Sequence, residues 1–389
     1  MQTIFNIILF VLGLSLLIFI HEFGHFIFAK TFKVYCLEFS IGMGPSIVSK
    51  KFKKDEETTY SIRALPIGGY VSMAGETLDN AENEKELEIP YQRTINGINP
   101  WKRALITVAG VAFNFIFALI LLTVFIFVNG VGSDESTVVI VKDSIAKEYG
   151  LSTGDKILYV KNIVVKADGE EIYSDCTETD DKCEVVYFST FKTYLDHPGL
   201  IEQVKDYHKE NPEAEIIQEI TIIYSHKGTE GEQAAPMYRT FNNETDSFEL
   251  LGINQTRKIP NLFEGLKLVF VTFGEIVVAM CKALASLFSP EGFNNLGGVV
   301  SMYQTSTAMA SEGVLSYILF LAFISINLGF FNLLPIPALD GARFYISIAE
   351  GITGKKFNPK IEGYLNLVGM ILLFGLMIVV TVKDVFMFF

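Results

Sequence analysis

The chain has 389 residues, enough for two or three domains if the protein were soluble. Half of its residues are apolar, 33 are Phe, and the mean hydropathy is +0.36. A soluble core does not need so much apolar surface, so the composition indicates a membrane protein. The formal net charge of −13 argues against nucleic-acid binding, which depends on basic stripes.

Four uncharged segments are long enough to cross a bilayer. Each reaches the roughly 20 apolar residues that a hydrocarbon layer about 30 Å thick requires. The uncharged stretches are residues 1–20, 104–132, 313–339 and 363–382. With their flanks they predict membrane segments at 1–30, 101–129, 313–341 and 362–383.

The basic residues near these segments predict the orientation. Lysines and arginines follow the first segment, precede the second and separate the third from the fourth: Lys30, Lys33, Lys102, Arg103, Lys355, Lys356 and Lys360. Cytoplasmic loops carry the excess of such residues, so both termini are expected outside. A cleaved signal peptide is the alternative for the N-terminus. Residues 1–20 lack its basic start and small-residue cleavage site.

Two stretches between the spans have strand character. Residues 34–73 contain short alternating runs separated by Gly and Pro, and predict a small sheet against the cytoplasmic membrane face. Residues 130–260 hold 13 Lys/Arg against 25 Asp/Glu, a difference of −12, and are expected to face outward. There, Asp143 to Ile157 predicts a short helix closed by Gly150, a turn and a strand.

That order is typical of PDZ domains of proteases, so we expect an extracytoplasmic α+β PDZ domain at 134–256. Residues 168–215 are polar and acidic, and are interpreted as an insertion into it. Cys176 and Cys183 lie in this block and would pair in an oxidising compartment; two free thiols are the alternative.

Residues 261–289 predict a different kind of helix. Its four charged residues fall in one narrow stripe: Glu264, Lys267, Glu275 and Lys282. We expect an amphipathic helix in the interface or beside the spans. A fifth span is the alternative, and would reverse the topology beyond it. The predicted fold class is a polytopic α-helical membrane protein of four transmembrane helices, with a small membrane-associated β region and the inserted PDZ domain.

The strongest chemical signal is His21-Glu22-Phe23-Gly24-His25. On a helix, histidines four residues apart share one face, so both can bind one Zn²⁺, while Glu22 acts as general base. The motif follows directly on an apolar span, where ionisable groups are costly and are functional candidates. The alternative is a set of cytoplasmic residues just beyond the span. Phe23 and residues 26–28 continue the apolar helix and disfavour it.

Two nitrogens leave zinc short of a ligand, and Asp340 is the best candidate for the third. It is the only acidic residue between Gly313 and Tyr345, and it follows Pro335 and Pro337. Two such prolines interrupt a membrane helix, which is tolerated at depth where the chain lines a cavity. Asn327 and Asn332 add amides on the same approach, and are hypothesised to hold substrate backbone.

These residues resemble the site-2 protease family, and within it the bacterial members similar to the regulator-of-sigma-E protease. His21 to His25 matches the family's zinc motif, and residues 332–341 match its second motif, in which the aspartate is the third zinc ligand. Residues 39–45 and 63–71 resemble its membrane-associated β region. Three family patterns are altered here, at 110–114, 296–299 and 339–342, but no ligand or base is lost.

The resemblance implies an intramembrane zinc metalloprotease in the cell (inner, cytoplasmic) membrane, with its active site toward the cytoplasm. It implies as partners the lipid bilayer and single-pass membrane proteins already trimmed by another protease. Such substrates include anti-sigma factors and remnant signal peptides, cleaved in regulated intramembrane proteolysis. The PDZ domain would then gate access, as a size filter or by recognising a new carboxyl terminus.

Two other functions compete with this one. A membrane zinc protease of the surface-acting type would use a Glu from a Glu-x-x-x-Asp helix as third ligand. The matches to that pattern, 171–175 and 202–206, lie in the outward block. A PDZ-bearing scaffold or chaperone without activity would be favoured by loss of Glu22 or of a ligand, and all of these are present.

Overall fold

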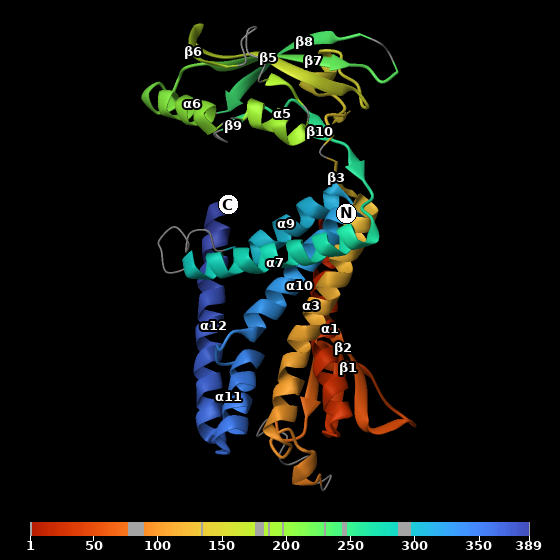
Figure 1. Cartoon of the computed structure of the whole chain (residues 1–389). Helices are drawn as coiled ribbons and strands as arrows, with labels where there is room; N and C mark the ends of the chain where they lie inside the picture. Colours follow the sequence, from red (N-terminus) through yellow and green to blue (C-terminus); the bar gives the residue numbers. More distant parts are fainter. Residues whose placement is uncertain are drawn as a thin grey trace. The chain divides into compact units, whose positions relative to one another are not determined.

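The computed structural model describes residues 2–388 except 77–88, 134, 176–182, 186, 197, 229–230, 243–246 and 287–296. The chain forms two compact units (Figure 1). The first consists of Met1–Val128 and Asn261–Phe389, and the second of Asn129–Pro260. The hydrophilic block of the sequence is therefore a unit inserted between two halves of the apolar one.

Among the described residues, five helices of the first unit are long and apolar enough to cross a membrane, where the sequence predicts four. They are α1 (Gln2–Thr31), α3 (Pro100–Asn129), α7 (Leu262–Ser286), α10 (Val314–Leu333) and α12 (Pro359–Phe388). The additional candidate is α7, which runs across α3 and α10 rather than beside them (Figure 1). Length and composition allow five spans, and the four-span count stays a prediction.

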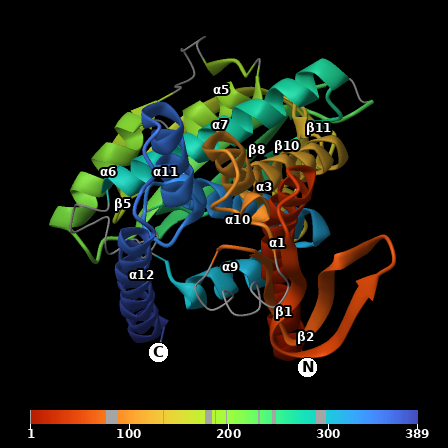
Figure 2. The ribbon, with the colours of Figure 1, turned by 90° about the horizontal axis from the view of Figure 1, so that it is seen from below.

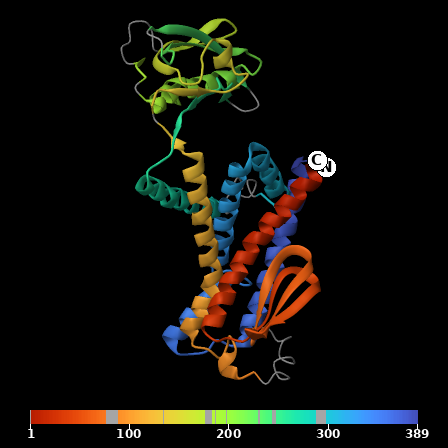
Figure 3. The same cartoon turned by 90° about the vertical axis from the view of Figure 1, so that its right-hand side faces the viewer.

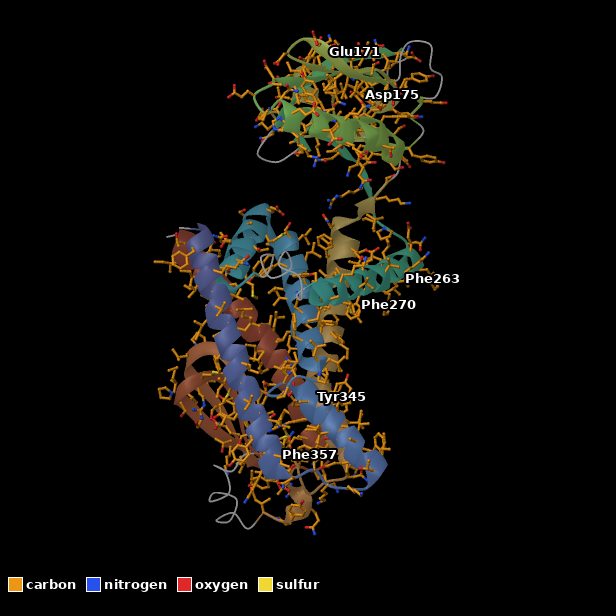
Figure 4. All side chains as sticks on the ribbon, turned by 90° about the vertical axis from the view of Figure 1, so that its left-hand side faces the viewer. Glu171, Asp175, Phe263, Phe270, Tyr345 and Phe357 are labelled. Atoms are coloured by element: carbon orange, nitrogen blue, oxygen red, sulfur yellow. The ribbon has the colours of Figure 1, made fainter. Side chains whose placement is uncertain are left out.

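One face of α7 packs on the helix bundle and the other is bare. Phe273 contacts Phe115 of α3 at 5.4 Å between ring centroids. Elsewhere on the helix, between this packed side and the charged stripe, Phe263 is 84% and Phe270 62% exposed (Figure 4). An apolar face without protein cover is what an interfacial helix leaves for lipid.

The other helices surround a small apolar core. Phe10 and Leu17 of α1 pack with Phe320 and Leu321 of α10. The shorter α9 (Val299–Glu312) lies between α1 and α12 (Figure 2). Near the end of α12, the buried Asp384 carboxylate accepts hydrogen bonds from two backbone N–H groups at the start of α9, at 2.8 and 3.1 Å. A carboxylate there satisfies N–H groups that a helix start leaves unpaired.

The β region consists of two long strands, β1 (Cys36–Phe52) and β2 (Asp55–Met73), on the side of α1 away from α12 (Figures 1 and 2). Both strands bend, so residues 38–41 of β1 pair with 59–62 on one side and 69–72 on the other. Residues 69–73 therefore form an edge. Gly42, at a φ of +86° that favours glycine, lies at the bend where the sequence indicates a break.

The Glu38 side chain of β1 forms hydrogen bonds with two residues of β2. Its carboxylate accepts hydrogen bonds from Arg63 at 2.8 Å and from the Tyr70 hydroxyl at 2.6 Å. Burial by itself would raise the pKa of Glu38, but hydrogen bonds from Ser61, Tyr70 and Arg63 hold it below its usual value.

A short helix, α11 (Asp340–Thr353), is anchored to the start of α3 by a buried ion pair. The Arg103 guanidinium binds the Glu350 carboxylate and donates to Ser347 Oγ at 2.8 Å. The Arg103 side chain is 13% exposed and that of Glu350 is 8% exposed. Glu350 also accepts the Phe357 N–H at 2.6 Å. The bonds of Arg103 join the second half of α11 to the first turn of α3. They therefore fix the position of α11 relative to α3.

The second unit has its own hydrophobic core. A five-stranded sheet has the order β6-β5-β7-β8-β9. Its strands are β5 (Lys156–Ala167), β6 (Glu170–Asp175), β7 (Ile216–Ser225), β8 (Gln233–Asn242) and β9 (Ser247–Phe248). Strict alternation along β7 buries every second side chain, as a strand with one face on the core requires. Separate two-stranded pairings join β4 (Val138–Ile140) to β10 (Ile253–Gln255) and β3 (Val131–Gly132) to β11 (Arg257–Lys258).

The short helix expected before Gly150 is α4 (Ile145–Glu148). Residues 168–215, interpreted as an insertion, contain β6, α5 (Phe188–Leu195) and α6 (Pro198–Glu210), and their being an insertion stays a prediction. Phe191, Leu200 and Val204 from these helices are fully buried in the core. Cys183 is disulfide-bonded, whereas Cys176 lies outside the described residues.

We expect Glu350→Ala to destabilise the first unit by about 3 to 5 kcal/mol, because it leaves the Arg103 charge buried without its partner. Denaturant unfolding of the full chain in detergent, followed by circular dichroism, measures the loss. The double substitution Arg103→Met and Glu350→Met removes both charges, and should recover most of the stability. A single variant as stable as the wild type would contradict the proposed anchoring role.

Candidate metal centre

Three potential ligands converge at the middle of the first unit. His21 and His25 come from α1, and Asp340 is the first residue of α11. One donor atom from each lies within 4.8 Å of the other two, and they form the one such group of three or more His, Cys, Asp or Glu among the described residues. His21 and His25 are 5% and 6% exposed, whereas the Asp340 side chain is 28% exposed, so the centre is open to solvent on the Asp340 side alone among its three ligands.

The tautomer of His25 is fixed by the backbone of α3. His25 Nδ1 lies 2.7 Å from the Ile106 carbonyl oxygen, which can only accept, so Nδ1 carries the proton. In the neutral ring Nε2 then has a free lone pair, and it is this atom that faces Asp340 at 3.2 Å. A carbonyl that orients a histidine in this way is typical of metal sites.

Asn114 orients the His21 ring, as the Ile106 carbonyl orients that of His25. The Asn114 amide is fully buried on α3, and its nitrogen lies 3.1 Å from His21 Nδ1 while its oxygen has no partner. Turning the amide by 180° makes the oxygen accept a proton from His21 Nδ1, which satisfies the oxygen. His21 Nε2 is then free to bind a cation. The unpaired oxygen is thus explained if His21 is a ligand.

The distances among the donor atoms suit zinc. Asp340 Oδ2 lies 2.8 Å from His21 Nε2 and 3.2 Å from His25 Nε2, and the two histidine nitrogens are 3.2 Å apart. Ligands about 2.0 to 2.1 Å from a tetrahedral zinc are about 3.3 Å from each other. Two imidazoles and one carboxylate also match the donor set of catalytic zinc, which keeps a fourth position open.

Close packing and hydrogen bonds fix the residues on either side of Asp340. A Cβ at residue 341 would come 2.1 Å from the Leu334 carbonyl oxygen, so only glycine fits after the aspartate. The Ala338 N–H donates to Asn366 Oδ1 of α12 at 3.1 Å. Beyond them, Arg343 donates to Glu76 at 2.6 Å, just after β2. Asp340 is therefore positioned by contacts with α12 and with the β region.

Glu22 lies on the side of α1 that faces the sheet. Its Oε2 accepts a hydrogen bond from the Val71 N–H of β2 at 3.1 Å. Val71 belongs to the edge segment 69–73, so the outer edge of that segment is directed at Glu22. The sequence motif marks Glu22, but nothing in it indicates the partner strand.

The two asparagines proposed for substrate both lie on α10 and are half-buried. The Asn327 amide donates to the Phe323 carbonyl of its own helix at 3.1 Å. Among the described residues, no hydrogen bond joins either side chain to His21, His25 or Asp340, and their role stays a prediction. Asn114 belongs to the altered family pattern at 110–114, which by itself indicates no role for it. In the sequence, Asn114 could have been noticed as a lone amide in an otherwise apolar span.

Comparison with known proteins gives one consistent result. The family model "Peptidase family M50" matches residues 9–376. A "Putative zinc metalloprotease" of Clostridium acetobutylicum is 33% identical over 393 residues, covering 99% of this chain and 98% of that protein. A protein of the same designation from Fusobacterium nucleatum is 32% identical, covering 97% and 98%. The "Probable protease eep" of Enterococcus faecalis is 29% identical, covering 99% of both.

Gly110 of α3 provides a test of this centre. A Cβ there would lie 2.4 Å from His25 Nε2 and 2.8 Å from His21 Cε1, so Gly110→Ala must displace both rings. We expect zinc affinity to fall roughly 10- to 100-fold, as when a group that orients metal ligands is lost. Competition with a zinc chelator measures the affinity. Gly274→Ala on α7, where a Cβ meets nothing within 4 Å, is the matched control. Unchanged affinity in Gly110→Ala would exclude these histidines as ligands.

Proposed function

The chain belongs to peptidase family M50 and is a zinc metalloprotease, and from this premise we propose that it cleaves transmembrane segments of single-pass membrane proteins. The observation that carries the proposal is the convergence of His21, His25 and Asp340 from two helices of an apolar unit. An active centre among helices that are apolar enough to span supports hydrolysis inside or at the edge of the bilayer.

We assign His21, His25 and Asp340 as the zinc ligands and Glu22 as the catalytic base. Zinc supplies Lewis-acid polarisation of the peptide carbonyl and activation of a water molecule. Glu22 takes the proton of the attacking water and returns it to the nitrogen of the leaving amine. Asn114 and the Ile106 carbonyl keep the histidine rings oriented throughout, because both act on the ring nitrogens away from Asp340.

Substrate is held as an extended strand in this proposal. A peptide bond within a helix is shielded by its neighbours, so a transmembrane helix must unwind before hydrolysis. Residues 69–73 form a sheet edge that, among the described residues, pairs with no strand other than β1 and is directed at Glu22 through the Val71 N–H. Addition of an unwound segment to that edge would bring its backbone beside the base, as in strand-addition complexes. Asn327 and Asn332 are proposed to bind the same backbone from α10.

The second unit is proposed to be a PDZ domain on the outer side of the cell membrane. Its short helix, the left-handed Gly150 at a φ of +92° and the strand β5 support this assignment. There it would restrict access to substrates already shortened by another protease, with the active site toward the cytoplasm. Remnant signal peptides and anti-sigma factors are the substrate classes proposed for such a protease in regulated intramembrane proteolysis.

Two substitutions separate catalysis from metal binding. Glu22→Gln removes the base but no ligand, so we expect cleavage to fall by about 10² to 10⁴-fold with zinc retained. Asp340→Asn weakens a ligand, so zinc and activity should fall together. Both are measured on the full chain in nanodiscs, by cleavage of a single-pass reporter and by elemental analysis.

Glu275→Gln, on the charged stripe of α7, serves as the matched control and should cleave normally. Reporter cleavage at the wild-type rate by zinc-loaded Glu22→Gln would refute the assignment of the base. Full zinc content in Asp340→Asn after dialysis against chelator would refute the third ligand.

A further inference from the structure

A cavity of about 570 Å³ lies where α1 ends, away from the metal centre. Its lining includes Lys30 and Lys33 after the apolar part of α1, and Gln92 and Arg93 from the segment before α3; Glu57, Phe32 and Val34 complete it. Figure 3 shows the end of α1, the β region and the start of α3 gathered at this end of the unit. The cavity therefore opens at the depth where the apolar stretch of α1 gives way to polar residues.

The cations of this cavity are held in place by two carboxylates. Lys30 Nζ lies 2.8 Å from Asp55 Oδ1, and Arg93 binds Glu57 with two bonds of 2.8 and 2.7 Å. Arg93 also donates to the Lys33 carbonyl at 3.2 Å and stacks on Tyr35. These contacts order the Lys30 and Arg93 side chains before any ligand arrives, which lowers the entropic cost of binding.

Two further cations leave the site positive. Lys33 lines the cavity, and Lys102 lies with its Nζ 5.8 Å from the Phe32 ring centroid. Among the described residues, no carboxylate pairs with either lysine. Within the described part of the site, Asp55 and Glu57 are matched by Lys30 and Arg93, so Lys33 and Lys102 add two positive charges beyond these pairs. Such an excess attracts a phosphate group.

The other end of the site is apolar. Phe32 forms part of the cavity wall, and its ring contacts that of Phe28, one turn back along α1, at 6.1 Å between centroids. Both rings are half-buried, so each keeps an accessible surface. A cationic cavity next to aromatic rings on an apolar helix fits an amphiphile, which has a charged head group and an apolar chain. A free phosphate would make no use of the aromatic rings.

We propose that this cavity binds the head group of an anionic phospholipid, with the phosphodiester at Lys33 and Gln92 and an acyl chain along Phe32 and Phe28. Arg93 and Lys30 contribute charge, and Lys102 closes the site beside Phe32. The ligand class is a glycerophospholipid of net negative charge, such as phosphatidylglycerol. The proposal does not depend on the substrate or on the metal ligands.

Lipid retention by the full-length, zinc-loaded protein tests the proposal. The purified protein is incubated in detergent with equimolar phosphatidylglycerol and phosphatidylcholine, and retained lipid is counted by native mass spectrometry. The variants are Lys33→Glu and Gln92→Glu, with Lys51→Glu as matched control, because Lys51 is an exposed lysine of β1 outside the cavity. Inorganic phosphate and glycerol 3-phosphate are added as soluble competitors. Zinc content and melting temperature verify folding, and Gln92→Glu keeps the test intact if Lys33→Glu is unstable.

We expect the wild type and Lys51→Glu to retain phosphatidylglycerol over phosphatidylcholine. Lys33→Glu and Gln92→Glu should each weaken that retention about fivefold or more, the effect of at least one charge near a lipid surface. Equal retention of the two lipids would overturn the proposal, as would cavity variants that behave like Lys51→Glu. Displacement of phosphatidylglycerol by equimolar inorganic phosphate would show a soluble-anion site instead, and would also overturn it.

Discussion

The contact between Asp340 and the two histidines of α1 is the constraint on which the rest of the first unit depends. It joins residues 315 and 319 positions apart in the chain, at 3.2 and 2.8 Å. Three groups that each prefer water are brought together in an apolar unit, at a cost that only mutual binding or a metal offsets. The first unit must therefore keep α1 and α11 at fixed positions relative to each other. Many of its polar contacts help to do so.

Helix α3 is the common support of the centre. It orients His25 through the Ile106 carbonyl, approaches both rings at Gly110, and carries Asn114 beside His21. At its first turn, Arg103 fixes the helix that begins with Asp340. The two halves of the centre are thus placed by one rigid element. This arrangement explains why a single glycine or arginine distant in sequence from the motif should influence metal binding.

The candidate centre was predictable from sequence because its signals are local. The spacing of His21 and His25 puts both on one helix face, and Asp340 is conspicuous as a lone acid after two prolines. The supporting contacts were not predictable, because Val71, Asn114 and Arg103 act through neighbours that only the tertiary fold supplies. The polar average of residues 168–215 likewise conceals buried side chains, Phe191 on α5 and Leu200 and Val204 one turn apart on α6.

X-ray absorption at the zinc edge of the full-length protein tests the central assignment most directly. Coordination by His21, His25 and Asp340 predicts two imidazole nitrogens and at least one oxygen, all at about 2.0 to 2.2 Å, with no sulfur. In Asp340→Asn the oxygen shell should change while both imidazoles remain. A sulfur shell at about 2.3 Å, or a spectrum unaltered by Asp340→Asn, would contradict the account.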